Sequence, residues 1–141
     1  MELREEIRLT PLHVEAHVKL SKLLLKEMRL GEAVAHLWPA IQDTPREHSA
    51  PLRFQLGLAL ALQQQPDAAE PLLEQVLQLE PGFVEAEICL SNCQAAQGKF
   101  ASAATSLRRA AALRPEIADW CESQSVQLRA QAEREGGGGD R

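Results

Sequence analysis

Apolar residues recur along this chain at intervals of three and four, the spacing of one face of an α-helix. The segment from Leu52 to Leu60 shows this pattern, with Leu56 and Ala59 between its ends, and a second segment begins at Ala69. Short polar or glycine-containing breaks interrupt the pattern at 29–31, 64–66 and 98–99. It predicts helices over 13–28, 31–43, 50–64, 66–79, 83–97 and 100–113, and an amphipathic helix from 117 to about 133.

Four prolines divide the helical segments into units of similar length. Their separations are 34, 36 and 34 residues, and self-similarity at such a period is typical of arrays of helical repeats. The second and third units align without a gap, and the first aligns if two extra residues lie in the 46–49 loop. The prolines are Pro11, Pro45, Pro81 and Pro115. The matching columns are Leu20, Leu56 and Leu90; Ser21, Gly57 and Ser91; Ala33, Ala69 and Ala103; Leu37, Leu73 and Leu107; and Ala40, Val76 and Ala110.

Each unit has the pattern of a helix hairpin closed by its proline, which lacks an amide hydrogen and disfavours helix in the residue before it. Small residues allow two helix backbones to approach to about 8–10 Å. We therefore expect the alanine column at Ala33, Ala69 and Ala103 to form the contact within each hairpin. One hairpin cannot bury both of its apolar faces, so neighbouring hairpins must stack.

The period, the helix pairs and these columns resemble tetratricopeptide repeats over residues 11–115. The resemblance implies an all-α fold, a right-handed superhelix (α-solenoid) of antiparallel helix hairpins. The chain departs from the usual pattern because large aromatic residues are missing from the first helices; His17, Arg53 and Glu87 occupy one such column. Pro39 lies inside a second helix and is expected to kink that helix or displace its start.

The ends of the chain complete the predicted division. The first ten residues align with the last turns of a second helix, which predicts that the chain begins inside a repeat. Trp120 is expected to cover the exposed end of the last hairpin from a terminal helix with one polar face. The expected units are a partial second helix at 1–10, repeat 1 at 11–45, an inserted loop at 46–49, repeat 2 at 50–81, repeat 3 at 82–115, a C-terminal capping helix at 116–134 and a flexible tail at 135–141.

Composition supports this fold and excludes several functions. Aromatic residues make up 4% of 141 residues, which argues against a β-sandwich or barrel. The net charge of −5 argues against a nucleic-acid partner, which requires clustered Lys and Arg. The longest apolar stretch, within 56–62, is far shorter than the roughly 20 residues that cross a bilayer, so no membrane partner is expected. Three cysteines form no disulfide framework and indicate a reducing, cytoplasmic location.

No set of residues indicates catalysis, a metal ion or a cofactor. His13 and His17 have the i, i+4 spacing of metal ligands, but a third ligand and a suitably placed glutamate are missing. Ser21 and Ser91 occupy small-residue columns, which packing explains better than nucleophilic chemistry. A glycine-rich phosphate loop before a helix is also absent from the sequence. We therefore expect no enzyme activity, no metal and no cofactor.

The resemblance implies a binding groove, because the first helices of successive tetratricopeptide units line a concave surface. Some of these positions can instead be core residues. One subfamily holds acidic C-terminal chaperone tails with a clamp of Lys, Asn, Asn, Lys and Arg in that order, and none of the matching positions in this chain carries the required residue. The residues expected to line the groove are Val18, Lys22, Leu25, Phe54, Leu58, Leu62, Glu85, Ile88 and Asn92. The clamp positions are Val18, Lys22, Gln55, Glu85 and Cys89.

These observations predict a protein–protein interaction module, an adaptor or scaffold. An apolar groove with acids at its margin suits an amphipathic helix or an apolar segment with basic flanks, and no chaperone tail. The molecule is expected to be a monomer or to self-associate weakly. The alternatives are a structural module for self-assembly or docking within a complex, and an accessory repeat region of a larger enzyme.

Overall fold

The computed structural model describes residues 14–136 and contains helices with no strand in that range. Each predicted helix is present there, with ends within two residues of those expected, so the all-α fold is confirmed. None of the described helices is long and apolar enough to cross a membrane. The helices are α2 (Val14–Lys26), α3 (Leu30–Gln42), α4 (Ala50–Leu62), α5 (Pro66–Leu79), α6 (Val84–Ala96), α7 (Phe100–Leu113) and α8 (Ala118–Arg134), and short 3-10 turns span Arg46–His48 and Pro115–Ile117.

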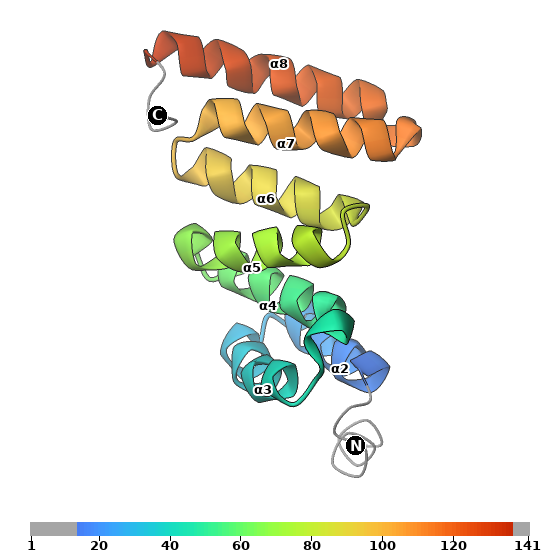
Figure 1. Cartoon of the computed structure of the whole chain (residues 1–141). Coiled ribbons are helices and arrows are strands. Elements are labelled where there is room, and N and C mark those ends of the chain that lie inside the picture. The colour runs from blue at the N-terminus through green and yellow to red at the C-terminus, as the bar shows by residue number, and fades with distance from the viewer. Residues whose placement is uncertain (1–13, 137–141) are drawn as a thin grey trace.

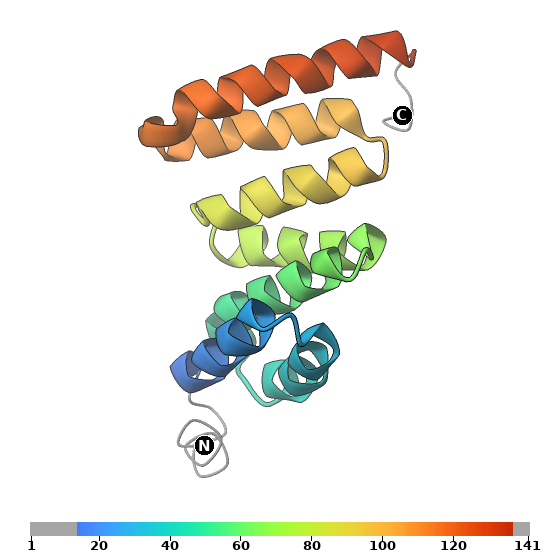
Figure 2. The ribbon, with the colours of Figure 1, turned by 180° about the vertical axis from the view of Figure 1, so that it is seen from behind.

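The helices form a stack of antiparallel neighbours that follows chain order (Figure 1). The pairs α2–α3, α4–α5 and α6–α7 are hairpins, and α8 lies along α7 at the end of the stack (Figures 1 and 2). The first helices also contact one another, α2 with α4 and α4 with α6. This arrangement places α2, α4 and α6 side by side and positions the groove described below.

The repeat columns form the core, as predicted. Ala33, Ala69 and Ala103 are fully buried between the helices of their hairpins. At Gly57 an added Cβ atom would lie 3.1 Å from the side chain of Leu73, so a larger residue there would require Leu73 to move where α4 crosses α5. The equivalent crossing in the third hairpin is tied by a hydrogen bond of 2.9 Å from Ser91 Oγ to the Ala103 carbonyl. Small residues therefore set the helix separation in these hairpins.

Both tryptophans are partly exposed, and Trp120 does not pack as the sequence predicted. Trp120 is 51% exposed and Trp38 is 46% exposed. The buried residues of α8 are Cys121, Ser125 and Ala132, which lie on one helical face. Trp120 precedes this face by one residue and so points about 100° away from it. The expectation that Trp120 covers the last hairpin is therefore wrong, and Cys121 occupies that place.

The inserted loop and the proline in α3 are both accommodated locally. Residues 46–48 form a 3-10 turn, and Ser49 Oγ donates a hydrogen bond of 2.7 Å to the Arg46 carbonyl. Helix α3 continues through Pro39 to Gln42, and it starts at Leu30, one residue before the predicted start. The predicted helix at 1–10, the metal-spaced His13 and the part of the tail at 137–141 lie outside the described residues.

The column that lacks aromatics holds polar side chains that reach the second helix of their own hairpin. His17 Nδ1 lies 3.0 Å from Nε2 of His36, and Arg53 donates a hydrogen bond of 2.5 Å to Gln75 Oε1. Glu87 is buried, and its Oε1 has no hydrogen-bond partner among the described residues. Burial raises the pKa of Glu87, and the charge of Arg109 opposes this only in part.

Glu87→Gln is expected to raise stability at neutral pH. The folded state holds the Glu87 proton more tightly than the unfolded chain, so this carboxyl reduces stability as the pH rises from its unfolded pKa through the raised folded pKa. Urea unfolding at about pH 4 and about pH 7 should show the variant's advantage growing toward neutral pH. Glu122→Gln, at an exposed position, is the control and should show no such trend. An advantage confined to the acidic pH would contradict the assignment.

Candidate protein-binding groove

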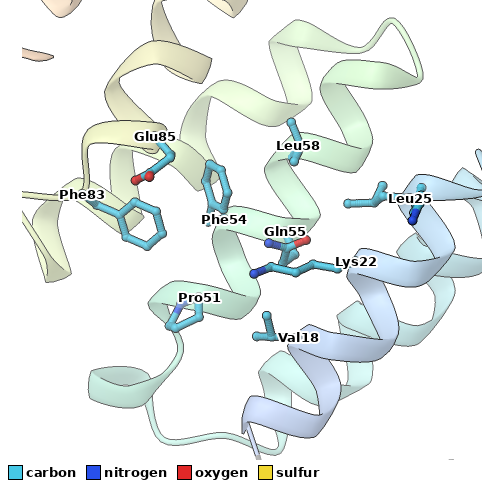
Figure 3. A pocket seen from close by; sticks show the side chains of 10 residues that line it. Val18, Lys22, Leu25, Pro51, Phe54, Gln55, Leu58, Phe83 and Glu85 are labelled. Carbon is cyan, nitrogen blue, oxygen red and sulfur yellow. The ribbon is translucent and has the colours of Figure 1, made fainter. Parts of the chain in front are cut away.

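A cavity of about 600 Å³ opens between the first helices α2, α4 and α6 (Figure 3). We call it the groove. Its lining is mostly apolar, and polar groups are few. The lining residues are Val18, Lys22, Leu25, Lys26, Pro51, Phe54, Gln55, Leu58, Phe83 and Glu85. Six of the nine predicted groove residues thus line one cavity: Val18, Lys22, Leu25, Phe54, Leu58 and Glu85.

Helical spacing brings the lining residues of α4 together. Pro51, Phe54, Gln55 and Leu58 follow at intervals of three and four, so their side chains share one face of α4. The opposite faces of α4 pack into the core through residues such as Leu52. Helix α4 is therefore apolar on more than one side, and part of its apolar surface lines the groove.

Phe54 and Phe83 form the aromatic part of the groove. Their ring centroids are 4.9 Å apart with planes tilted by 38°, and Figure 3 shows the two rings side by side. Sequence reasoning missed Phe83, which immediately precedes α6 and follows the turn at Pro81 and Gly82. The sequence signal for Phe83 was its position, a large apolar residue at the start of the first helix of a hairpin. The partly covered rings of Phe54 and Phe83 provide a contact surface for a ligand.

Gln55 is the unusual polar residue of the groove. It is only 4% exposed, and its Oε1 has no hydrogen-bond partner among the described residues. Figure 3 shows its amide beside the Lys22 side chain at the cavity. A buried amide oxygen without a partner destabilises the protein by about 1–3 kcal/mol. Sequence reasoning could not detect this feature, because a glutamine on a first helix is usually solvated.

The charges of the groove differ from a uniformly acidic margin. Lys22 and Lys26 lie on the α2 side, and Glu85 lies on the α6 side. Glu85 accepts a hydrogen bond of 3.2 Å from Arg114. The pKa of Glu85 is lowered mainly by a hydrogen bond from its backbone amide, and further by Arg114 and Lys22, against an opposing effect of burial. The groove therefore has two lysines on one side and, on the other, the ionised carboxylate of Glu85, which is already paired with Arg114.

A second cavity of about 570 Å³ adjoins the groove at Pro51, which lines both. Three carboxylates line it, those of Glu15, Glu47 and Glu80. Its lining residues are Val14, Glu15, Thr44, Pro45, Glu47, His48, Pro51 and Glu80. The two cavities together give a surface that is basic at one end, apolar in the middle and acidic at the other end.

Three predicted groove residues lie elsewhere. Leu62 is 42% exposed at the end of α4 and does not line the groove. Ile88 packs against the core formed by α6, α7 and α8, and Asn92 lines a separate small cavity of about 100 Å³. The sequence alignment places these residues on first helices, but the cavity is confined to part of each helix: Leu62 lies one turn beyond Leu58, which does line it.

The positions of the chaperone-tail clamp meet at the groove without the clamp's chemistry. Val18, Lys22, Gln55 and Glu85 line it, and Cys89 is buried. A hydrogen bond with Cys93 and then burial raise the pKa of the Cys89 thiol, so it stays neutral. The clamp has a cationic arginine at this position. Lys22 is the one basic residue among these positions.

Groups suited to catalysis or metal binding do not gather at the groove. The described residues contain no cluster of three His, Cys, Asp or Glu side chains that would hold a metal ion. The nearest arrangement is the His17–His36 pair, which lies between α2 and α3 and not among the groove residues. The three cysteines are buried free thiols.

Comparison with known proteins agrees with this fold. Residues 60–121 match the family model described as tetratricopeptide repeat, and no match was found among the curated proteins. The structure is similar to a thermophilic TPR protein of Thermus thermophilus, with 25% identity, a TM-score of 0.73 and coverage of 92% of this chain and 69% of that chain.

Two further solved structures share the fold and are described with peptides. One is the type III secretion chaperone SycD of Yersinia enterocolitica in complex with a peptide of the translocator YopD; identity is 16%, the TM-score is 0.72, and 86% of this chain and 94% of that chain are covered. The other is YrrB, a TPR protein with an unusual peptide-binding site; identity is 18%, the TM-score is 0.69, and 92% of this chain and 72% of that chain are covered. At these identities the likeness concerns the fold.

Proposed function

Because the chain is a tetratricopeptide repeat protein, we propose that it is a non-catalytic adaptor that binds a segment of a partner protein in the groove between α2, α4 and α6. Repeat modules of this kind present a preformed surface made by several hairpins, so binding requires little ordering of the receptor. Fold neighbours described with a bound peptide or with a peptide-binding site support this class of function.

The observation that carries the proposal is the buried amide of Gln55. Its Oε1 is buried and lacks a hydrogen-bond donor among the described residues, although Gln55 is one of the residues that line the open, largely apolar groove. If the Gln55 side chain turns toward the groove on binding, a segment that donates an N–H group to this oxygen would remove an unfavourable feature of the free protein. In mostly apolar binding sites, a few polar groups orient the ligand and provide selectivity by hydrogen-bonding to it.

The rest of the groove indicates the chemistry of the segment. An apolar side chain fits against the Phe54–Phe83 pair and Leu58. Basic residues flanking that side chain would face the carboxylates of the adjoining cavity, and a polar or acidic residue would face Lys22. The partner is therefore proposed to be an amphipathic helix or an extended apolar segment with basic residues on one flank.

Gln55→Leu tests the proposal because it should change stability and affinity in opposite directions. Leucine removes the unpartnered oxygen, so unfolding in urea should require at least as much denaturant as for the wild type. A partner captured by immobilised wild-type protein, then purified, should bind the variant about tenfold more weakly because a hydrogen bond to the segment is lost.

Gln94→Leu is the matched control. Gln94 is also buried on a first helix, but its Oε1 accepts a hydrogen bond of 2.9 Å from Ser106 Oγ, and it does not line the groove. This variant should lose stability and keep its affinity for the partner. Equal affinities of the wild type and Gln55→Leu would contradict the groove assignment.

Self-assembly or docking within a complex is the alternative, and the exposed face of α8 favours considering it. Trp120 and Val126 are both more than half exposed there. Light scattering over a range of concentrations distinguishes the functions, since an adaptor keeps the mass of one chain and a self-assembling module does not. An accessory role in a larger enzyme would require a catalytic domain in the same protein.

A further inference from the structure

A third cavity, of about 610 Å³, lies on the other side of α4, between α3 and α5. We call it the outer trough. The trough residues of α4 include Arg53 and Leu60, whereas Phe54 and Leu58 of the same helix line the groove. The largest apolar side chain that lines the trough is that of Trp38, which is 46% exposed. The lining residues are Val34, Trp38, Arg53, Leu60, Gln63, Gln65, Ala68, Pro71, Leu72 and Gln75.

The same positions one repeat later are bridged by polar contacts. The residues that align with Val34, Gln63 and Gln65 are Glu70, Gln97 and Lys99. There, Gln97 Nε2 and Lys99 Nζ lie 2.7 Å and 3.2 Å from Glu70 Oε1 and donate hydrogen bonds to it. These contacts tie α5 to the α6–α7 turn.

The trough, which lies between the first and second repeats, has no such bridge. Valine replaces the carboxylate at Val34, and glutamine replaces the lysine at Gln65. Likewise, the hydrogen-bonded pair Gln94 and Ser106 aligns with two leucines, Leu60 and Leu72. Between the second and third repeats these positions form polar contacts. Between the first and second repeats the same positions instead line a cavity, and Trp38 lies at its side.

Arg53 is the one charged residue that lines the trough. Its guanidinium donates hydrogen bonds of 2.8 Å to Ser49 Oγ and 2.5 Å to Gln75 Oε1, and both acceptors are neutral. In the third repeat the aligned pair is Glu87 and Arg109, of opposite charge. Among the described residues no carboxylate is paired with Arg53.

The electrostatic setting of Arg53 agrees with this geometry. Burial, followed by the charge of Arg46, lowers the pKa of the Arg53 guanidinium. Neither effect is relieved by an acidic neighbour in the part of the chain that the structure describes. A carboxylate brought to the trough would form a charge-assisted, bidentate hydrogen bond that the free protein lacks.

We propose that the outer trough is a second docking site, which binds a partner segment carrying an aspartate or glutamate next to an apolar side chain. The carboxylate pairs with Arg53, and the apolar side chain packs against Trp38, Leu60 and Leu72. The amides of Gln63 and Gln65 are placed to hydrogen-bond the segment's main chain. Occupied together, the groove and the trough would let one chain join two partner segments across α4.

The test uses a library of capped decapeptides with one fixed glutamate flanked by randomised Leu, Val, Pro and Ala, beside a matched library with glutamine at that place. Binding is followed by the fluorescence of Trp38 in a Trp120→Phe background, which leaves one tryptophan as reporter. The glutamate library is expected to yield peptides with Kd below about 1 mM. Failure to find any such peptide would overturn the proposal.

Three variants assign the site of a selected peptide. Arg53→Gln should weaken binding at least about tenfold, and replacing the peptide's glutamate by glutamine should then have little further effect, because the two groups act as a pair. Val34→Glu with Gln65→Lys copies the Glu70–Lys99 bridge into the trough and should abolish binding in a protein that still unfolds cooperatively. Leu58→Glu, in the groove, should leave binding unchanged. Binding that survives the bridging variant, or that is lost with Leu58→Glu alone, would overturn the assignment.

Discussion

Leu73→Ala is expected to lower the free energy of unfolding by about 3–5 kcal/mol, a large part of the stability of a domain of this size. Leu73 is fully buried where α5 crosses α4, so the substitution removes apolar contacts and leaves a cavity. Urea unfolding followed by circular dichroism measures the loss. Leu113→Ala is the matched control, because Leu113 is 43% exposed and its truncation should change stability by less than about 1 kcal/mol. Equal losses in the two variants would contradict the packing described.

A double-mutant cycle with Gly57 tests the same contact from the other helix. An added Cβ at Gly57 would lie 3.1 Å from the Leu73 side chain, so Gly57→Ala alone should destabilise the protein. In the Leu73→Ala background the clash is absent, and alanine should stabilise through its higher helix propensity, by up to about 1 kcal/mol. A reversal of sign between the two backgrounds is the expected result. The same sign in both would show that Gly57 is present for another reason.

Leu58→Glu is expected to weaken binding of a groove-dependent partner by about 100-fold. Leu58 is half-buried and lines the groove between the α2 side and the Phe54 ring, so a carboxylate there replaces apolar contact with a group that must be desolvated. Isothermal titration with a partner captured by the wild-type protein measures the change. Circular dichroism should show that the helical fold persists, because Leu58 is not one of the fully buried residues.

Leu62→Glu separates a local effect from a general effect of charge. Leu62 lies one turn further along α4, is 42% exposed and does not line the groove. The two variants carry the same added charge on the same helix, so long-range electrostatic effects should be similar. We expect Leu62→Glu to change affinity by less than about threefold. If both variants lose affinity to the same extent, the binding surface extends beyond the groove defined by the structure.

Much of the groove was predictable because repeats share one geometry. The residues matching the family's groove columns on α2 and the start of α4 do line the cavity, as Val18, Phe54 and Leu58 show. Leu62, Ile88 and Asn92, which the same columns assigned to the groove, do not line this cavity. Alignment gives the helix on which a residue lies, whereas its direction also depends on how each hairpin is rotated against the next.

The sequence by itself determined the helices, their order in the stack and the columns that pack between them. These follow from local propensity, from prolines that end helices and from a repeated apolar pattern, all of which are written in short stretches of chain. Only the tertiary structure decided that Gln55 is buried without a partner, that Phe83 joins Phe54, and that Arg53 lies in an apolar trough without a carboxylate. These features depend on which side chains of separate hairpins come together, and burial is a property of the assembled stack that no single repeat contains.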